Sequence, residues 1–186
     1  MEKVKSSVQA SVYIATSLDG FIARKNGDLD WLHQGGSRPE NQDYGYSAFM
    51  NTVDALVMGR NTFEIVRAFK EWPYGSKPVV VLTSRRVKIP EELEDTVSVM
   101  SGSVPAVLGQ LAAKGWHHLY VDGGVTIQRF LAAGAIQRMI ITRIPVLIGQ
   151  GIPLFGRLKR DIRLRHVATR DYPAGLVQSE YEVLQS

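Results

Sequence analysis

The chain has 186 residues, no cysteine and a net charge of +4. That length suits one domain over residues 1–186, and the absence of cysteine excludes disulfides, thiolate nucleophiles and thiolate zinc sites. No apolar run reaches the roughly 18 residues that cross a bilayer, and residues 1–7 do not resemble a signal peptide, so we expect a cytoplasmic protein without membrane contact. The mild basic excess favours small anionic ligands and does not require nucleic acid.

The first part of the chain predicts a strand, a long loop and a helix. Residues 8–15 are β-branched and aromatic, which indicates a strand, and turn residues follow it. Residues 16–39 then form a candidate active-site loop. Pro39 opens a helix predicted over residues 40–51.

Asp43 lies in the first turn of this predicted helix. A carboxylate there can simply stabilise the positive end of the helix dipole. It also stands between aromatic residues, Tyr44 and Tyr46 among them, where a partly dry pocket would let it hold or relay a proton. Both roles stay open at this point.

Three predicted strands, over residues 53–58, 79–82 and 116–121, end in segments with glycine, hydroxyl or guanidinium groups. Free N–H groups at a helix start and arginine side chains both bind phosphate. The candidate anion-binding residues are Gly59, Arg60, Thr62, Thr83, Ser84, Arg85, Gly123, Gly124 and Thr126. The four histidines offer no ligand cluster, because the adjacent His117 and His118 would point to opposite faces of a strand, and we expect no metal site.

The remaining pattern predicts an α/β fold. Helices over residues 104–114 and 125–133 alternate with strands over 97–100 and 139–144, and strands over 161–170 and 176–184 form an antiparallel hairpin. This order predicts a mainly parallel central sheet with an antiparallel edge. Ligands of such sheets lie beyond the carboxyl ends of the strands, where the candidate residues gather. The set suits a dinucleotide that carries an added ribose phosphate.

Six short segments occur in the order and spacing of a known family: residues 14–22, 27–31, 58–64, 81–85, 121–124 and 148–155. Through them the chain resembles the dihydrofolate reductase-like superfamily. Within it, the match is to the C-terminal reductase domain of the riboflavin biosynthesis deaminase-reductase, RibD, here in a stand-alone form.

The resemblance implies a three-layer dihydrofolate reductase-like fold and NADPH-dependent hydride transfer. It places Ala15 and Ile22 at the nicotinamide end. It places the 59–62 and 123–126 junctions on the pyrophosphate, and residues 83–85 on the adenosine ribose phosphate. It also strengthens a catalytic role for Asp43, which lies as far before Gly59 as the substrate-binding carboxylate of dihydrofolate reductases lies before the matching glycine.

Two departures bear on the substrate. Lys77-Pro78 stands where dihydrofolate reductases have the arginine for the folate tail, and the Asp-Asp/Asn-Pro motif of riboflavin reductase domains is missing. The resemblance still implies a 5-amino-6-(5-phosphoribosylamino)uracil reductase-like activity on a pyrimidine or pterin-like acceptor. The alternatives are a divergent dihydrofolate reductase and a non-catalytic NADPH-binding protein, with a nucleic-acid binder weakest. Relatives of the riboflavin type are commonly homodimers, which the apolar loop 144–155 would accommodate.

Overall fold

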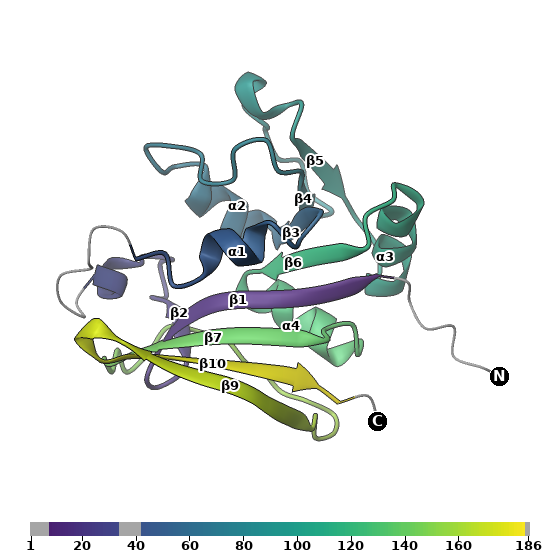
Figure 1. Cartoon of the computed structure of the whole chain (residues 1–186). Coiled ribbons are helices and arrows are strands. Elements are labelled where there is room, and N and C mark those ends of the chain that lie inside the picture. The colour runs from purple at the N-terminus through teal and green to yellow at the C-terminus, as the bar shows by residue number, and fades with distance from the viewer. Residues whose placement is uncertain (1–7, 34–41, 185–186) are drawn as a thin grey trace.

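A computed structural model describes residues 8–33 and 42–184 of the chain. An eight-stranded sheet with the order β5-β4-β3-β6-β1-β7-β10-β9 forms its centre (Figure 1). In this spatial order, every pair of neighbouring strands from β5 through β4, β3, β6 and β1 to β7 is parallel. Strand β10 runs antiparallel to both β7 and β9. The predicted mainly parallel sheet with an antiparallel C-terminal hairpin is confirmed. Its strands are β1 (Gln9–Ser17), β3 (Ala55–Gly59), β4 (Val79–Leu82), β5 (Val97–Met100), β6 (His118–Asp122), β7 (Arg138–Ile144), β9 (Leu164–Tyr172) and β10 (Leu176–Val183).

Helices cover both faces of the sheet, which gives the three predicted layers. Successive strand residues point to opposite faces, so each strand supplies two cores. Val57 and Val121 pack with α3 (Val104–Ala113) and α4 (Gly124–Ala132) on one face. Met58 and Tyr120 pack with α1 (Tyr46–Met50) and α2 (Arg60–Val66) on the other. The continuous apolar runs of the central strands follow from this double burial.

The helix predicted over residues 40–51 is shorter than expected. It begins at Tyr46, because Tyr44 and Gly45 adopt left-handed φ values of 57° and 87° that interrupt a right-handed helix. Asp43 therefore lies before α1 and not in its first turn. Residues 40 and 41 of the predicted helix lie outside the described residues, as do residues 34–39 of the candidate loop.

A second, two-stranded sheet joins the loop after β1 to the loop after β7. Strand β2 (Phe21–Ala23) pairs antiparallel with β8 (Ile152–Pro153). The exposed carboxylate of Asp19 accepts hydrogen bonds from the N–H groups of Ile148 and Gly149, at 3.3 and 2.7 Å. These contacts hold the two loops together beside the carboxyl ends of β1 and β7. No described helix is long and apolar enough to cross a membrane.

Candidate functional site

The carboxyl ends of β3 and β6 form two interlocked glycine turns. A Cβ atom on Gly123 would overlap the hydroxyl oxygen of Thr62, and one on Gly59 would lie 3.0 Å from the hydroxyl oxygen of Thr126. Each turn therefore has a glycine where the threonine of the other turn enters. Gly123 also has a φ of 89°, which an L-residue side chain disfavours. Four of the predicted cofactor residues thus belong to one packed unit.

Gly124 brings the predicted nicotinamide end to the same place. A Cβ atom on Gly124 would lie 3.2 Å from Ile22 of β2 and 3.0 Å from the Pro153 carbonyl oxygen of β8. The two glycines are thus needed for close approach of neighbouring segments. Ala15 lies near the carboxyl end of β1, the strand next to β6 in the sheet, and pairs with Thr142 of β7.

The start of α4 presents free backbone donors. Its N-cap is Gly123, with no side-chain cap and no acidic residue in the first turn. The first intrahelical bond runs from the N–H of Ile127 to the carbonyl of Gly123, so the N–H groups of residues 124–126 have no helix acceptor. In contrast, Ser103 caps α3 by accepting a hydrogen bond from the Ala106 N–H. The uncapped α4 start suits an anionic group.

The predicted arginine and hydroxyl groups lie on the neighbouring strand ends. Arg60 opens α2 directly after β3, and Thr83 follows β4, whose Leu82 pairs with Gly59. The hydroxyl of Thr83 accepts a hydrogen bond from the Arg85 N–H at 3.0 Å, which closes a turn. Ser84 and Arg85 are exposed at this turn. Their side chains are therefore accessible beside the two glycine turns.

Asp122 is the functional candidate that sequence reasoning missed. It ends β6, directly before the glycine pair, and accepts a hydrogen bond from the Gly123 N–H at 2.7 Å. Asp122 as a whole residue is partly exposed, but its carboxyl group is buried. This burial raises the pKa of the carboxyl from 3.8 to about 6. The available signal was an acidic residue at the end of an otherwise apolar strand. At neutral pH such a group exchanges a proton readily.

Three tyrosine side chains on the α1 and α2 side of the sheet lie within range of the Asp122 charge. Burial, followed by the charge of Asp122, raises the pKa of Tyr46 to about 12 and raises the pKa values of Tyr74 and Tyr120 as well. Tyr46 comes from α1, Tyr120 from β6 and Tyr74 from the segment after α2. The carboxyl therefore lies in an aromatic, poorly hydrated environment.

Asp43 has a different environment from Asp122. It is exposed and accepts hydrogen bonds from the N–H groups of Gly45 and Ser47, each at 2.9 Å. Hydrogen bonding by Ser47 and then Gly45 keeps the pKa of the carboxyl below its usual range. Asp43 is thus an ionised group engaged at the start of α1. A catalytic role for it stays a prediction.

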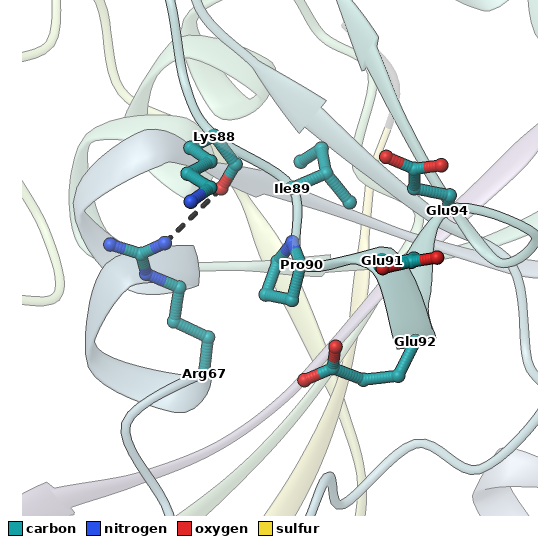
Figure 2. Close-up of a pocket in the computed structure, with 7 residues that line it drawn as sticks. All are labelled: Arg67, Lys88, Ile89, Pro90, Glu91, Glu92 and Glu94. Atoms are coloured by element: carbon teal, nitrogen blue, oxygen red, sulfur yellow. Dashed lines mark hydrogen bonds between the residues drawn. The ribbon is translucent and has the colours of Figure 1, made fainter.

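Two cavities in the described part of the chain lie away from the glycine turns. The larger, about 600 Å³, lies between the end of α2 and the connection from β4 to β5, where the Arg67 side chain donates to the Lys88 carbonyl (Figure 2). The smaller, about 230 Å³, lies between α1 and strands β7, β9 and β10. Neither is lined by a predicted site residue. Within residues 8–33 and 42–184, no group of three or more His, Asp or Glu side chains could hold a metal ion.

Comparison with known proteins identifies the family. The model of the RibD C-terminal domain matches residues 10–178. The chain belongs to the RibD C-terminal domain family. A curated relative, the uncharacterized protein YwjB of Bacillus subtilis, is 35% identical over 164 residues, which cover 87% of this chain and 90% of YwjB.

Solved structures confirm the fold. A putative riboflavin biosynthesis protein from Shewanella sp. PV-4 is 45% identical, covers 96% of this chain and 100% of its own, and superposes with a TM-score of 0.90. The Thermotoga maritima deaminase/5-amino-6-(5-phosphoribosylamino)uracil reductase gives 0.74 at 15% identity, over 95% of this chain and 57% of its own. Enterococcus faecalis dihydrofolate reductase, complexed with NADP(H), gives 0.64 at 17% identity, over 97% and 98%. The dihydrofolate reductase-like fold is therefore shown.

Proposed function

We propose that this protein is an NADPH-dependent reductase that transfers a hydride to a pyrimidine or pterin-like acceptor, in the manner of 5-amino-6-(5-phosphoribosylamino)uracil reductases. The observation that carries the proposal is the pairing at the end of β6. There, a carboxyl group with a pKa of about 6 directly precedes an uncapped helix start. One group suits proton transfer and the other suits an anionic cofactor. The solved relatives named for reductase activity and for bound NADP(H) share this fold.

The residues at the carboxyl edge of the sheet fit such a cofactor. The uncapped α4 start would face a pyrophosphate, and Arg60 and Thr62 of the adjoining junction would neutralise its charge. The exposed Ser84 and Arg85 would bind a ribose phosphate, which distinguishes NADPH from NADH. Ala15 and Ile22 would line the nicotinamide end. When bound, the reduced nicotinamide supplies the hydride.

Asp122 would supply the proton that completes the reduction. A C=N or C=O acceptor that gains a hydride at carbon also takes one proton at its heteroatom. The Asp122 carboxyl holds that proton up to about pH 6 because its surroundings disfavour the charged form. Asp43 could act as the proton donor only by leaving the N–H groups of Gly45 and Ser47. The structure thus gives physical support to Asp122 as the stronger candidate.

Thermal unfolding with each cofactor tests the proposal without the substrate. We expect NADPH to raise the melting temperature more than NADH does, because only NADPH carries the adenosine ribose phosphate that Arg85 would bind. The Arg85→Ala variant should lose most of the NADPH effect and keep the NADH effect. Arg86→Ala, at the next position, is the matched control. Equal weakening of both cofactors by Arg85→Ala would contradict the assignment of residues 83–85.

Kinetics then identify the acceptor. Turnover of the ribosylamino-pyrimidine without turnover of dihydrofolate would support the riboflavin-type reaction, and the reverse result would favour a divergent dihydrofolate reductase. Stabilisation by NADPH with turnover of neither compound would contradict both substrate assignments.

A further inference from the structure

Backbone hydrogen bonds join the loop after β1 to the loop after β7 around the β2–β8 sheet. The N–H of Leu18 donates to the Val146 carbonyl at 2.8 Å, and the N–H of Leu154 donates to the Gly20 carbonyl at 3.0 Å. Strand β2 has three residues, and its pairing with β8 shifts register. Because a two-stranded sheet of this size is marginally stable by itself, the position of β2 depends on further contacts.

Asp19 supplies one such contact with its side chain. Its carboxylate accepts hydrogen bonds from the N–H groups of Ile148 and Gly149, at 3.3 and 2.7 Å. Hydrogen bonding by Ser17, and then by Gly149 and Ile148, keeps the pKa of this carboxyl below its usual range. Asp19 is therefore ionised at neutral pH, and an ionised acceptor makes stronger hydrogen bonds than a neutral one. Asp19 thus holds the loop after β1 against the loop after β7.

Gln128 supplies a second contact, from α4. Its Nε2 donates to the carbonyls of Pro153 and Leu154, at 3.0 and 3.4 Å. The same side chain lies where a Cβ atom on Gly156 would be, so the chain after β8 packs closely on it. Gln128 therefore fastens the loop after β7 to α4, and Asp19 fastens the loop after β1 to that loop. Both loops are in this way connected to the helix whose start is uncapped.

These connections place Ile22 of β2 at the start of α4. A Cβ atom on Gly124 would lie 3.2 Å from both Ile22 and Ile152, so the two isoleucines border the helix start. The N–H groups of residues 124–126 have no helix acceptor there. A ligand whose pyrophosphate binds these N–H groups would therefore continue past the helix start beside Ile22.

We infer that Asp19 and Gln128 are positioning residues for the cofactor: together they hold Ile22 at the start of α4, where it contacts the nicotinamide end of NADPH. The inference rests on the proposed function and names the side chains that fix this end of the site. Neither side chain would touch the reacting atoms, and each acts through Ile22.

Calorimetric binding of two ligands tests the inference: NADPH, and 2′-phospho-ADP-ribose, which is the same molecule without its nicotinamide ring. Asp19→Ala removes both hydrogen bonds to the loop after β7, so Ile22 is no longer held against the ring. We expect the Kd of NADPH to rise about tenfold. The Kd of 2′-phospho-ADP-ribose should not change, because this compound has no ring for Ile22 to contact. A general disturbance of the site would instead weaken both ligands.

Asp28→Ala is the matched control. Asp28 is an exposed carboxylate of the same segment, and its side chain accepts a hydrogen bond from the neighbouring Asn26. The control removes the same negative charge, so it reports any purely electrostatic effect on the two anionic ligands. Relative to this control, Asp19→Ala should weaken NADPH alone.

Gln128→Ala interrupts the connection at α4 and provides a second variant in case Asp19→Ala does not fold. Alanine suits a helix, and we expect the same selective rise in the Kd of NADPH. Hydrogen exchange gives a readout without any ligand. The backbone N–H groups of residues 18–24 should exchange about tenfold faster in either variant than in the wild type, whereas those of α3 should not change.

Equal weakening of both ligands, unchanged NADPH binding by the folded variants, or unchanged exchange over residues 18–24 would overturn this inference alone. So would wild-type protein that binds NADPH and 2′-phospho-ADP-ribose with the same Kd. Failure of the wild type to bind NADPH would instead overturn the proposed function.

Discussion

Asp43 and Asp122 show how one residue type obtains two different chemistries from its surroundings. Asp43 is exposed and accepts two backbone N–H bonds, which favour its charged form. Asp122 accepts one N–H bond and lies among aromatic side chains, which disfavour its charged form. Of these two carboxyls, only that of Asp122 therefore keeps its proton up to about pH 6. The opposite pKa shifts of the two carboxyls therefore follow from their different environments.

Turnover should depend on the protonated form of Asp122. With a pKa of about 6, kcat/KM should be constant below pH 6 and fall about tenfold for each further pH unit. Asp122→Asn keeps an acceptor for the Gly123 N–H but cannot donate the same proton. We expect its kcat to fall about 100-fold and its profile to lose this dependence. Steady-state kinetics between pH 5 and 9 measure both effects. An Asn variant with the wild-type profile would rule out this role.

The same carboxyl should make stability depend on pH. Its pKa is raised from 3.8 to about 6 in the folded protein, so its contribution to the free energy of unfolding is full below pH 3.8 and is lost as the pH rises through 6. Asp122→Asn should therefore be more stable than the wild type at pH 8, by about 1–3 kcal/mol, and show no gain near pH 4. Urea unfolding at the two pH values measures this difference.

Asp43→Asn is the control of opposite sign. The pKa of Asp43 is lowered in the folded protein, so its stabilising contribution is present above its ordinary pKa of 3.8 and is lost in acid. This variant should be destabilised at pH 8 and resemble the wild type near pH 3. Turnover lost without loss of stability would instead support the catalytic role of Asp43.

At the scale of elements, the packing of the glycine turns predicts an unequal response to the same substitution. Gly123→Ala places a Cβ against Thr62 and forces a φ of 89°, so we expect a loss of about 3 kcal/mol or more. Gly134→Ala, at the end of α4, meets a similar φ of 67° but open space, and should cost about 1 kcal/mol. Chemical denaturation compares the two variants. Equal losses would show that backbone strain alone requires Gly123.

Sequence periodicity predicts the bounds of several local elements closely. Strands β4 and β5 have the predicted bounds, and α3 ends one residue early, because their apolar patterns are governed by local burial. The start of α1 could not be predicted, because a left-handed Tyr44 has no signature in residue type. The packing of Thr62 beside Gly123 and of Thr126 beside Gly59 could not be predicted either, because it depends on β3 and β6 becoming neighbours in the sheet. Asp122 was missed because its proton affinity arises from residues distant in sequence.

At the scale of the whole molecule, exposed apolar side chains gather where the loops after β1 and β7 meet. Leu18 and Leu147 are 57% and 70% exposed, and the Leu18 N–H donates to the Val146 carbonyl, which places the two segments side by side. Large exposed apolar residues that adjoin one another favour association with a partner. This pair therefore supports the prediction of a homodimer through the 144–155 loop.

Sedimentation should find a species of twice 20.7 kDa for the wild type. Leu147→Glu should shift it to the monomer, because it would bury two like charges at a two-fold interface. Phe69→Glu, which alters an apolar residue that is 46% exposed after α2, should leave the dimer intact. A wild-type monomer, or a dimer unaffected by Leu147→Glu, would remove this loop from the interface.

Because Thr62 packs beside Gly123 and Thr126 packs beside Gly59, substitutions at these positions should be correlated during evolution. Gly123 cannot gain a side chain unless Thr62 moves or becomes smaller, and a side chain on Gly59 would require Thr126 to shift slightly, so substitutions at these positions are expected to occur in pairs. Homologous chains with a larger residue at position 123 should therefore carry a smaller one at position 62. Where both pairs are retained, the separation of the two helix starts is inherited unchanged, and the acceptor can diversify around a constant cofactor geometry.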